Sequence, residues 1–174
     1  LGYDAVLLSM GGLQSLSIEE HLVRVRAIAA IIPVIGFYLQ PSVGGRIFPY
    51  HFWRELVEIE NIAAIKMAPF NRYQTIDVVR AVLDAGREKE IVLYTGNDDN
   101  IVADLVTPIQ AGVGGTVRTR YMDGGLLGQW AVWTHRAVAL LAAAKSARNA
   151  NTVPAALLAS GSALTTANAA IFDG

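Results

Sequence analysis

Short apolar runs and longer amphipathic segments alternate along this chain. Each apolar run is bounded by Gly, Pro or Asn, which is typical of buried strands. The segments between them repeat apolar residues at helical spacing. We therefore predict strands at 4–10, 33–40, 62–68 and 91–96, with a weaker one at 114–119. We predict helices at 17–31, 50–60, 72–85, 99–111, 126–147 and 155–172.

The alternation of strands with helices predicts an α/β fold with a parallel sheet. Two arrangements fit five such units, a doubly wound sheet or part of a (β/α)8 barrel. The chain has no G-x-G-x-x-G after a strand and no Walker motif, so nothing favours a dinucleotide fold. We expect one domain over 1–174, with βα units in 1–122 and helices in 123–174.

Composition narrows the class of protein. The net charge of −1 and the lack of a basic stripe argue against nucleic acid as a partner. The chain has no cysteine, so thiol catalysis and disulfides are excluded. No apolar run has the length of a membrane span, and we expect a cytoplasmic protein. The chain starts without Met and enters a strand at once, so we expect it to be part of a longer protein.

Lys66 is the most unusual residue of the pattern, because it lies inside an apolar strand. Burial of an ammonium group favours the neutral amine, which is a nucleophile towards carbonyl carbons. Strict alternation places Gly36 and Tyr38 on one face of their strand, and Ala64 and Lys66 on one face of the next. We therefore predict that Tyr38 and Lys66 approach each other at the carboxyl ends of adjacent strands.

Three segments resemble the dihydrodipicolinate synthase and N-acetylneuraminate lyase superfamily of class I aldolases. PVIGFYLQPSVGG resembles its tyrosine-containing strand motif, IAAIKMA its lysine motif, and IVLYTGNDD its Gly-Asp-Asp segment. The order and spacing agree over roughly 4–145, including the 28 residues from Tyr38 to Lys66. The resemblance implies a TIM barrel, of which this chain covers strands four to eight and the C-terminal helices.

The resemblance also implies a reaction. Lys66 would form a Schiff base with a keto acid or aldehyde, and Tyr38 would shuttle the proton during C–C cleavage or condensation. Ser42, Arg46, Gly96 and Val117 would contact the substrate. The family needs no cofactor and no metal, and it is often homo-oligomeric.

The sequence departs from the family at three positions. Leu39 replaces an Asn, Val43 stands where an Arg holds a substrate carboxylate, and Ala64 replaces a Gly. A relative of dihydrodipicolinate synthase with another substrate is therefore favoured.

Two other functions stay open. Asp98 and Asp99 follow a strand end and suit a hard cation, which would make the protein a metal-dependent barrel lyase. Capping of the next helix at its positive end is the simpler explanation of these two residues. A catalytically inactive barrel fragment is the other alternative. Arg118 and Arg120 lie at the end of the last predicted strand, where they are either contacts for an anionic substrate or solvated loop charges.

Overall fold

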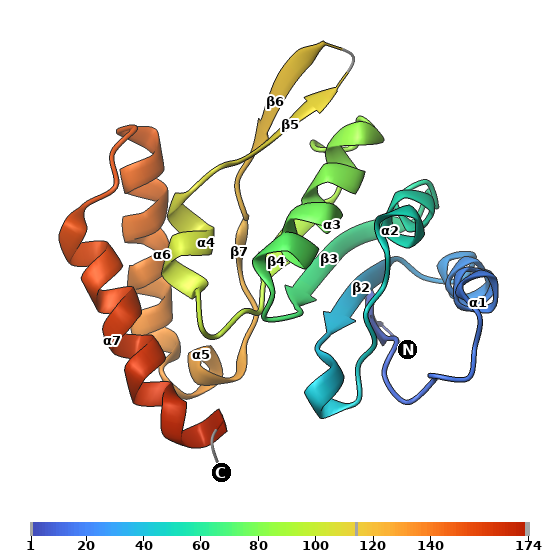
Figure 1. The fold of residues 1–174 in the computed structure, drawn as a ribbon, viewed down its shortest axis with the longest axis horizontal. Coiled ribbons are helices and arrows are strands. Elements are labelled where there is room, and N and C mark those ends of the chain that lie inside the picture. The colour runs from blue at the N-terminus through green and yellow to red at the C-terminus, as the bar shows by residue number, and fades with distance from the viewer. Residues whose placement is uncertain (1, 114, 173–174) are drawn as a thin grey trace.

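The computed structural model describes residues 2–113 and 115–172. Its centre is a five-stranded parallel sheet with the strand order β1-β2-β3-β4-β7 (Figure 1). The strands are β1 (Val6–Ser9), β2 (Val34–Leu39), β3 (Ile62–Ala68), β4 (Val92–Thr95) and β7 (Gly124–Gly125). Strands that follow each other along the chain and lie side by side in one direction are what repeated βα units produce.

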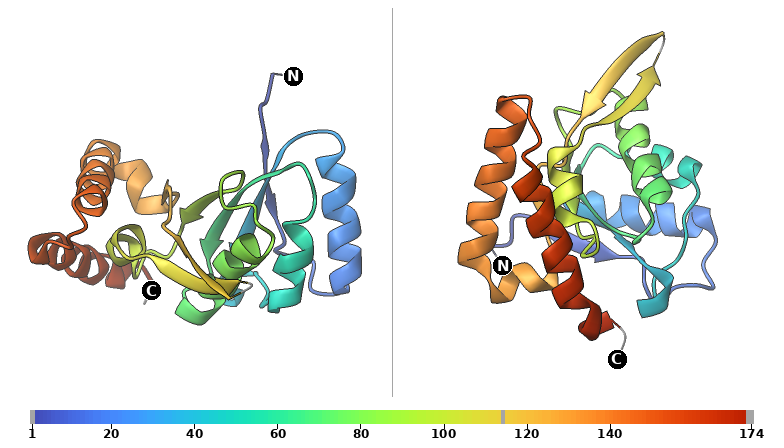
Figure 2. Two further views of the ribbon diagram at one scale, coloured as in Figure 1. Left: turned by 90° about the horizontal axis from the view of Figure 1, so that it is seen from above. Right: turned by 60° about the vertical axis from the view of Figure 1, so that its left-hand side comes forward.

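Three helices connect these strands and cover one face of the sheet (Figure 2): α1 (Ile18–Ala29), α2 (Tyr50–Leu56) and α3 (Arg72–Asp84). Sequence signals set their ends. Ser17 and Glu20 form a capping box at the start of α1, and the Asn71 side chain accepts from the backbone amides of Tyr73 and Gln74 in the first turn of α3. The main core lies between these helices and the sheet.

An aromatic cluster dominates that core. Phe48 stacks on Phe52 with ring centroids 4.1 Å apart, and Tyr38 lies 4.7 Å from Trp53. These side chains are at most 3% exposed. The cluster fixes α2 and the loop before it against β2.

The register between β2 and β3 shifts by one residue near their start. Val34 pairs with Ile62, but Ile35 pairs with Ala64, so Ala63 is the extra residue of a β-bulge. From there on, each residue of β3 lies on the face opposite to the one that strict alternation predicts.

The strand predicted at 114–119 is wrong as a member of the parallel sheet. Its residues belong to an antiparallel hairpin of β5 (Ile109–Val113) and β6 (Thr116–Arg120), which projects from the sheet in Figure 1. Residue 114 lies outside the described residues. The place beside β4 belongs to β7, whose two glycines carry no strand signal. Helix α4 (Ile101–Val106) is correspondingly shorter than the predicted 99–111.

The C-terminal part is helical, as predicted, with one break. The expected helix 126–147 divides at Trp133 into α5 (Gly128–Val132) and α6 (Thr134–Asn149). Helix α7 (Ala155–Phe172) lies beside α6 in both figures and packs on α4. Among the described residues, no helix combines the length and the apolar character that crossing a membrane requires.

Candidate active site

Lys66 lies on the face of the sheet that α1, α2 and α3 leave uncovered. Its register partners there are Phe37 on β2 and Tyr94 on β4. The Lys66 Nζ lies 4.2 Å from the centroid of the Phe37 ring. A lysine side chain between two aromatic residues near the carboxyl end of a parallel sheet is placed where barrel enzymes bind substrate.

The environment of Lys66 favours the neutral amine. Burial lowers the pKa of Lys66, and the negative charge of Asp98 partly opposes that shift. Among the ion pairs of residues 2–113 and 115–172, none includes Lys66. The Lys66 side chain is therefore half-buried and lies outside the ion pairs of the described residues.

Tyr38 does not approach Lys66, so the predicted pairing is wrong. Tyr38 pairs with Met67 and points to the helix-covered face, whereas Phe37 shares the face of Lys66. The Tyr38 side chain is fully buried, and its hydroxyl contacts the backbone oxygen and nitrogen of Phe48 at 3.4 and 3.3 Å. Burial raises the pKa of Tyr38. The bulge at Ala63 explains why Tyr38 and Lys66 lie on opposite faces, because it shifts the later residues of β3 by one position relative to β2.

Gly96 follows β4 and lies against Lys66. A Cβ on Gly96 would be 3.1 Å from the Lys66 Cε and 3.0 Å from the Ala68 Cβ. Only a residue without a side chain allows the backbone to pass this close. The structure thus places Gly96 at the candidate site.

A buried hydrogen-bond network holds the loop after β4. Asp104 on α4 accepts from the Thr95 hydroxyl at 2.6 Å and from the Asn97 amide at 2.9 Å. It also forms an ion pair with Arg72 at the start of α3. The Asp104 side chain is fully buried, and each of its oxygens has partners. The network therefore fixes the loop that passes over Lys66.

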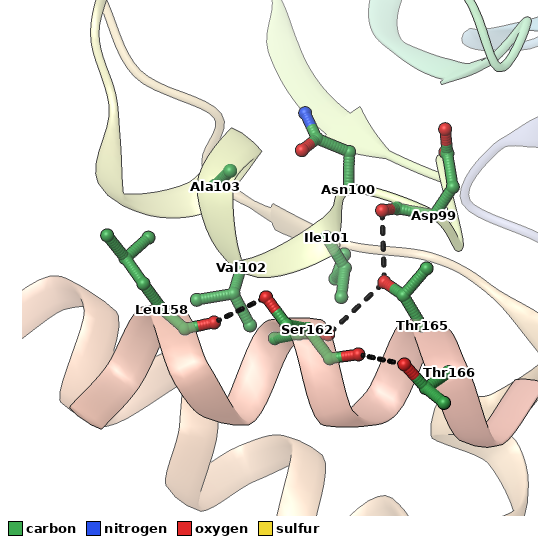
Figure 3. A pocket seen from close by; sticks show the side chains of 10 residues that line it. Asp99, Asn100, Ile101, Val102, Ala103, Leu158, Ser162, Thr165 and Thr166 are labelled. Carbon is green, nitrogen blue, oxygen red and sulfur yellow. Dashed lines mark hydrogen bonds between the residues drawn. The ribbon is translucent and has the colours of Figure 1, made fainter. Parts of the chain in front are cut away.

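The same loop is tied to the C-terminal helix. The Thr165 hydroxyl on α7 donates to the backbone oxygen of Asp99 at 3.0 Å (Figure 3). The loop and α4 line a groove of about 520 Å³ with α7, whose wall includes Ser162, Thr165 and Thr166.

The other predicted substrate contacts fall in different places. Ser42 lies just after β2, at the carboxyl edge of the sheet, and contacts Gln40 at 2.7 Å. Arg46 donates to the Leu16 backbone oxygen and lies over the Phe48 ring, so its contacts belong to the packing around the aromatic cluster. Val117 is 66% exposed on the projecting hairpin, away from the sheet strand expected for it.

The remaining charged candidates have structural partners. Arg118 contacts Glu88, and Arg120 contacts Asp123 and the Ile91 backbone oxygen, so neither is aimed at the carboxyl edge. In the part of the chain that the structure describes, no three His, Asp or Glu side chains gather as a metal-binding group. The metal-dependent alternative therefore lacks a ligand set among these residues.

Two residues of the site were missed by the sequence analysis. Phe37 was overlooked because its contact with Lys66 depends on the register shift, which no turn or glycine marks. Asp104 was overlooked as one acidic residue of an amphipathic helix. The only signal in the sequence was that Thr95, Asn97 and Asn100, which can donate hydrogen bonds, precede it by a few residues.

Two solved structures share this arrangement of strands and helices. Dihydrodipicolinate synthase from Bacteroides thetaiotaomicron superposes with a TM-score of 0.69 at 15% identity, over 97% of this chain and 50% of that one. The chain shares its fold with dihydrodipicolinate synthase. A variant of 2-keto-3-deoxygluconate aldolase from Sulfolobus solfataricus superposes with a TM-score of 0.61 at 14% identity, over 93% and 45% of the two chains.

The predicted fold class is thereby confirmed as part of a TIM barrel, and the chain spans about half the length of these two structures. No protein-family model matches the chain, and no curated protein matches it by sequence. At such low identity, the likeness is one of fold, and the chemistry has to be inferred from the residues.

Proposed function

We propose that the chain carries the reactive lysine of a carbon–carbon lyase of the aldolase kind. Lys66 attacks the carbonyl of a small keto acid or aldehyde and forms a Schiff base, which withdraws electrons from the neighbouring C–C bond. The observation that carries the proposal is the position of Lys66. It lies half-buried near the carboxyl end of the sheet, without an ion-pair partner among the described residues, and with a lowered pKa.

The fold supports this proposal, because two structures that share it are named as a synthase and an aldolase. The aromatic side chains of Phe37 and Tyr94 support it as well. They flank Lys66 in register and keep the amine in a poorly solvated setting, where the neutral form is favoured. Homo-oligomer formation stays a prediction.

Reductive trapping tests the proposal. Borohydride added with pyruvate, or with other short keto acids and aldehydes, should attach the substrate covalently to Lys66 in the intact protein. Peptide mass spectrometry locates the adduct, and Lys66→Met should abolish it. Lys89→Met and Lys145→Met are the matched controls and should leave it unchanged. If none of these carbonyl compounds gives an adduct, the proposal is contradicted and an inactive barrel is favoured.

A further inference from the structure

We propose that Asp98, and not Tyr38, exchanges protons with the Lys66 amine and with the substrate attached to it. This inference rests on the proposed Schiff-base function and adds the acid–base group to it. The site needs an acid–base group, because the residue beside Lys66 on β2 is Phe37, which has no exchangeable side-chain proton.

The sheet excludes Tyr38 from this role. Its hydroxyl is enclosed by the aromatic cluster on the opposite face and is engaged by the Phe48 backbone. Reaching Lys66 would require the ring to pass through the sheet between two hydrogen-bonded strands. A general acid or base must come within hydrogen-bond reach of the reacting atoms, directly or through one water.

The loop after β4 brings Asp98 to the face of Lys66. Gly96 touches the Lys66 side chain, and Asn97 turns into the buried network around Asp104. Asp98 comes next, and the Thr165 hydroxyl holds the backbone of the following residue. Asp98 is therefore carried by a loop fixed on both sides, which is what an acid–base group needs for a constant position.

Asp98 and Lys66 interact electrostatically without forming an ion pair. The charge of each acts on the pKa of the other, yet they are not among the ion pairs of the described residues. A direct ion pair would hold the amine as ammonium and block attack. Among the described residues no such pair restrains the Lys66 amine.

The surroundings also suit an acid. Burial raises the pKa of Asp98, the Lys66 charge lowers it, and the Asp99 charge raises it. Tyr94 is the other titratable side chain in register with Lys66 on this face. Helices α5 and α7 contain no charged residue. The half-buried carboxyl therefore retains its proton to a higher pH than an exposed one.

The neutral Lys66 amine forms the C–N bond, and the carbonyl oxygen takes a proton from the Asp98 carboxylic acid. The resulting carboxylate removes a proton from the positively charged nitrogen of the adduct. Asp98 then returns this proton to the hydroxyl as the C–O bond breaks. The products are water, the iminium ion and the Asp98 carboxylate, which stabilises the iminium charge.

The pH dependence of reductive trapping tests this inference in the intact protein, with the carbonyl compound that labels Lys66. The rate of adduct formation is measured from pH 5 to 10 for wild type, Asp98→Asn, Asp99→Asn and Tyr38→Phe. Asp98→Asn should slow trapping near neutral pH by about 100-fold, the lower range of general acid–base effects. The increase of the rate with pH should also move to lower pH, because Lys66 loses a stabilising negative charge.

Asp99→Asn is the matched control, since Asp99 is an exposed carboxyl on the same loop, and it should stay within about threefold of wild type. Circular dichroism confirms that each variant is folded. Unchanged trapping by a folded Asp98→Asn, or an equal loss in Tyr38→Phe, would overturn the role of Asp98 while leaving Lys66 as the nucleophile. No adduct in the wild type would overturn the proposed function itself.

Discussion

Close packing around single residues decides what the candidate site tolerates. A Cβ on Gly96 would lie 3.0–3.2 Å from the Ala68 side chain, the Lys66 side chain and the Leu126 backbone oxygen, so these neighbours would have to move by a few tenths of an ångström. His21 is similarly confined on the other side of the sheet, where its ring meets Phe48 and Phe52 edge-on. The close packing at Gly96 and at His21 each predicts a measurable change in stability.

Gly96→Ala should destabilise the protein by about 1–3 kcal/mol, the usual effect of overpacking. It should also reduce trapping of Lys66, because the new methyl displaces the lysine side chain or the loop. Urea unfolding and the trapping rate are the two measurements. Gly112→Ala is the control, since a Cβ there meets no atom within 4 Å. Equal stability of the two variants would contradict the close contact.

His21 should make the protein sensitive to mild acid. Burial lowers the pKa of His21, and the charge of Arg46 lowers it further. The unfolded chain therefore binds a proton between the folded pKa and the ordinary value of 6.5, so this stability is complete above pH 6.5 and is lost as the pH falls through the folded pKa. Chemical unfolding at pH 5 and 7.5 should show a smaller pH effect in His21→Leu than in wild type.

At the scale of elements, the loop after β4 connects three helices to the sheet. Asp104 joins α4 to β4 and α3, and Thr165 joins α7 to the same loop. The Asp104 bonds form a buried polar core, and the Thr165 bond to the loop lies at the surface. The order of the candidate site depends on this core, although none of its members reacts.

Asp104→Asn should be one of the more damaging single substitutions, at about 3 kcal/mol. It removes the charge that pairs with Arg72 and replaces an acceptor oxygen by a donor beside the amide of Asn97. Thermal unfolding measures the loss. Asp77→Asn breaks only the exposed ion pair with Arg80, 3.8 Å long, and should change stability by less than about 0.5 kcal/mol.

Several elements follow from local signals in the sequence, and the others depend on distant partners. The capping box at Ser17 and the apolar runs of β2 and β3 were sufficient to place these elements. By contrast, β7 is two glycines, and only its hydrogen bonds to β4 make it a strand. The hairpin at 109–120 replaced a predicted helix end and strand because pairing between its own halves outweighed helical spacing.

The candidate site was only partly predictable for the same reason. Lys66 and Gly96 could be found from the strand pattern and the resemblance, because both depend on their own strands. The partner of Lys66 depends on the register between two strands, which the bulge at Ala63 changes. Arg46 and Val117 lie on loops or hairpins whose directions the strand pattern does not determine.

At the scale of the whole molecule, the sheet has two different faces. Helices bury one of them, and the other presents Leu7, Phe37 and the half-buried Lys66. Helices and sheet together span about half of the barrels they resemble. The aromatic cluster and Lys66 thus lie on opposite sides of one sheet. Substitutions at Lys66 should therefore change stability independently of substitutions in the aromatic cluster.

Lys66→Met should raise the melting temperature at neutral pH. The lowered pKa of Lys66 means that the folded protein holds the ammonium less favourably than the unfolded chain does. This penalty is complete below the folded pKa and disappears as the pH rises towards 10.5. The stabilisation measured by thermal unfolding should therefore shrink from pH 7 to pH 10. A stabilisation independent of pH would point to packing alone.

The bulge at Ala63 matters for evolutionary comparison of barrels of this kind. Phe37 and Tyr38 are neighbours in the chain, and a shift of one residue in the strand register decides which of them shares a face with Lys66 and which packs under the helices. Where a relative lacks the extra residue, the tyrosine and the lysine would share a face again. Gain or loss of one codon in β3 would then change which side chain of β2 lies beside the lysine, while the tyrosine and lysine motifs in the sequence stayed the same.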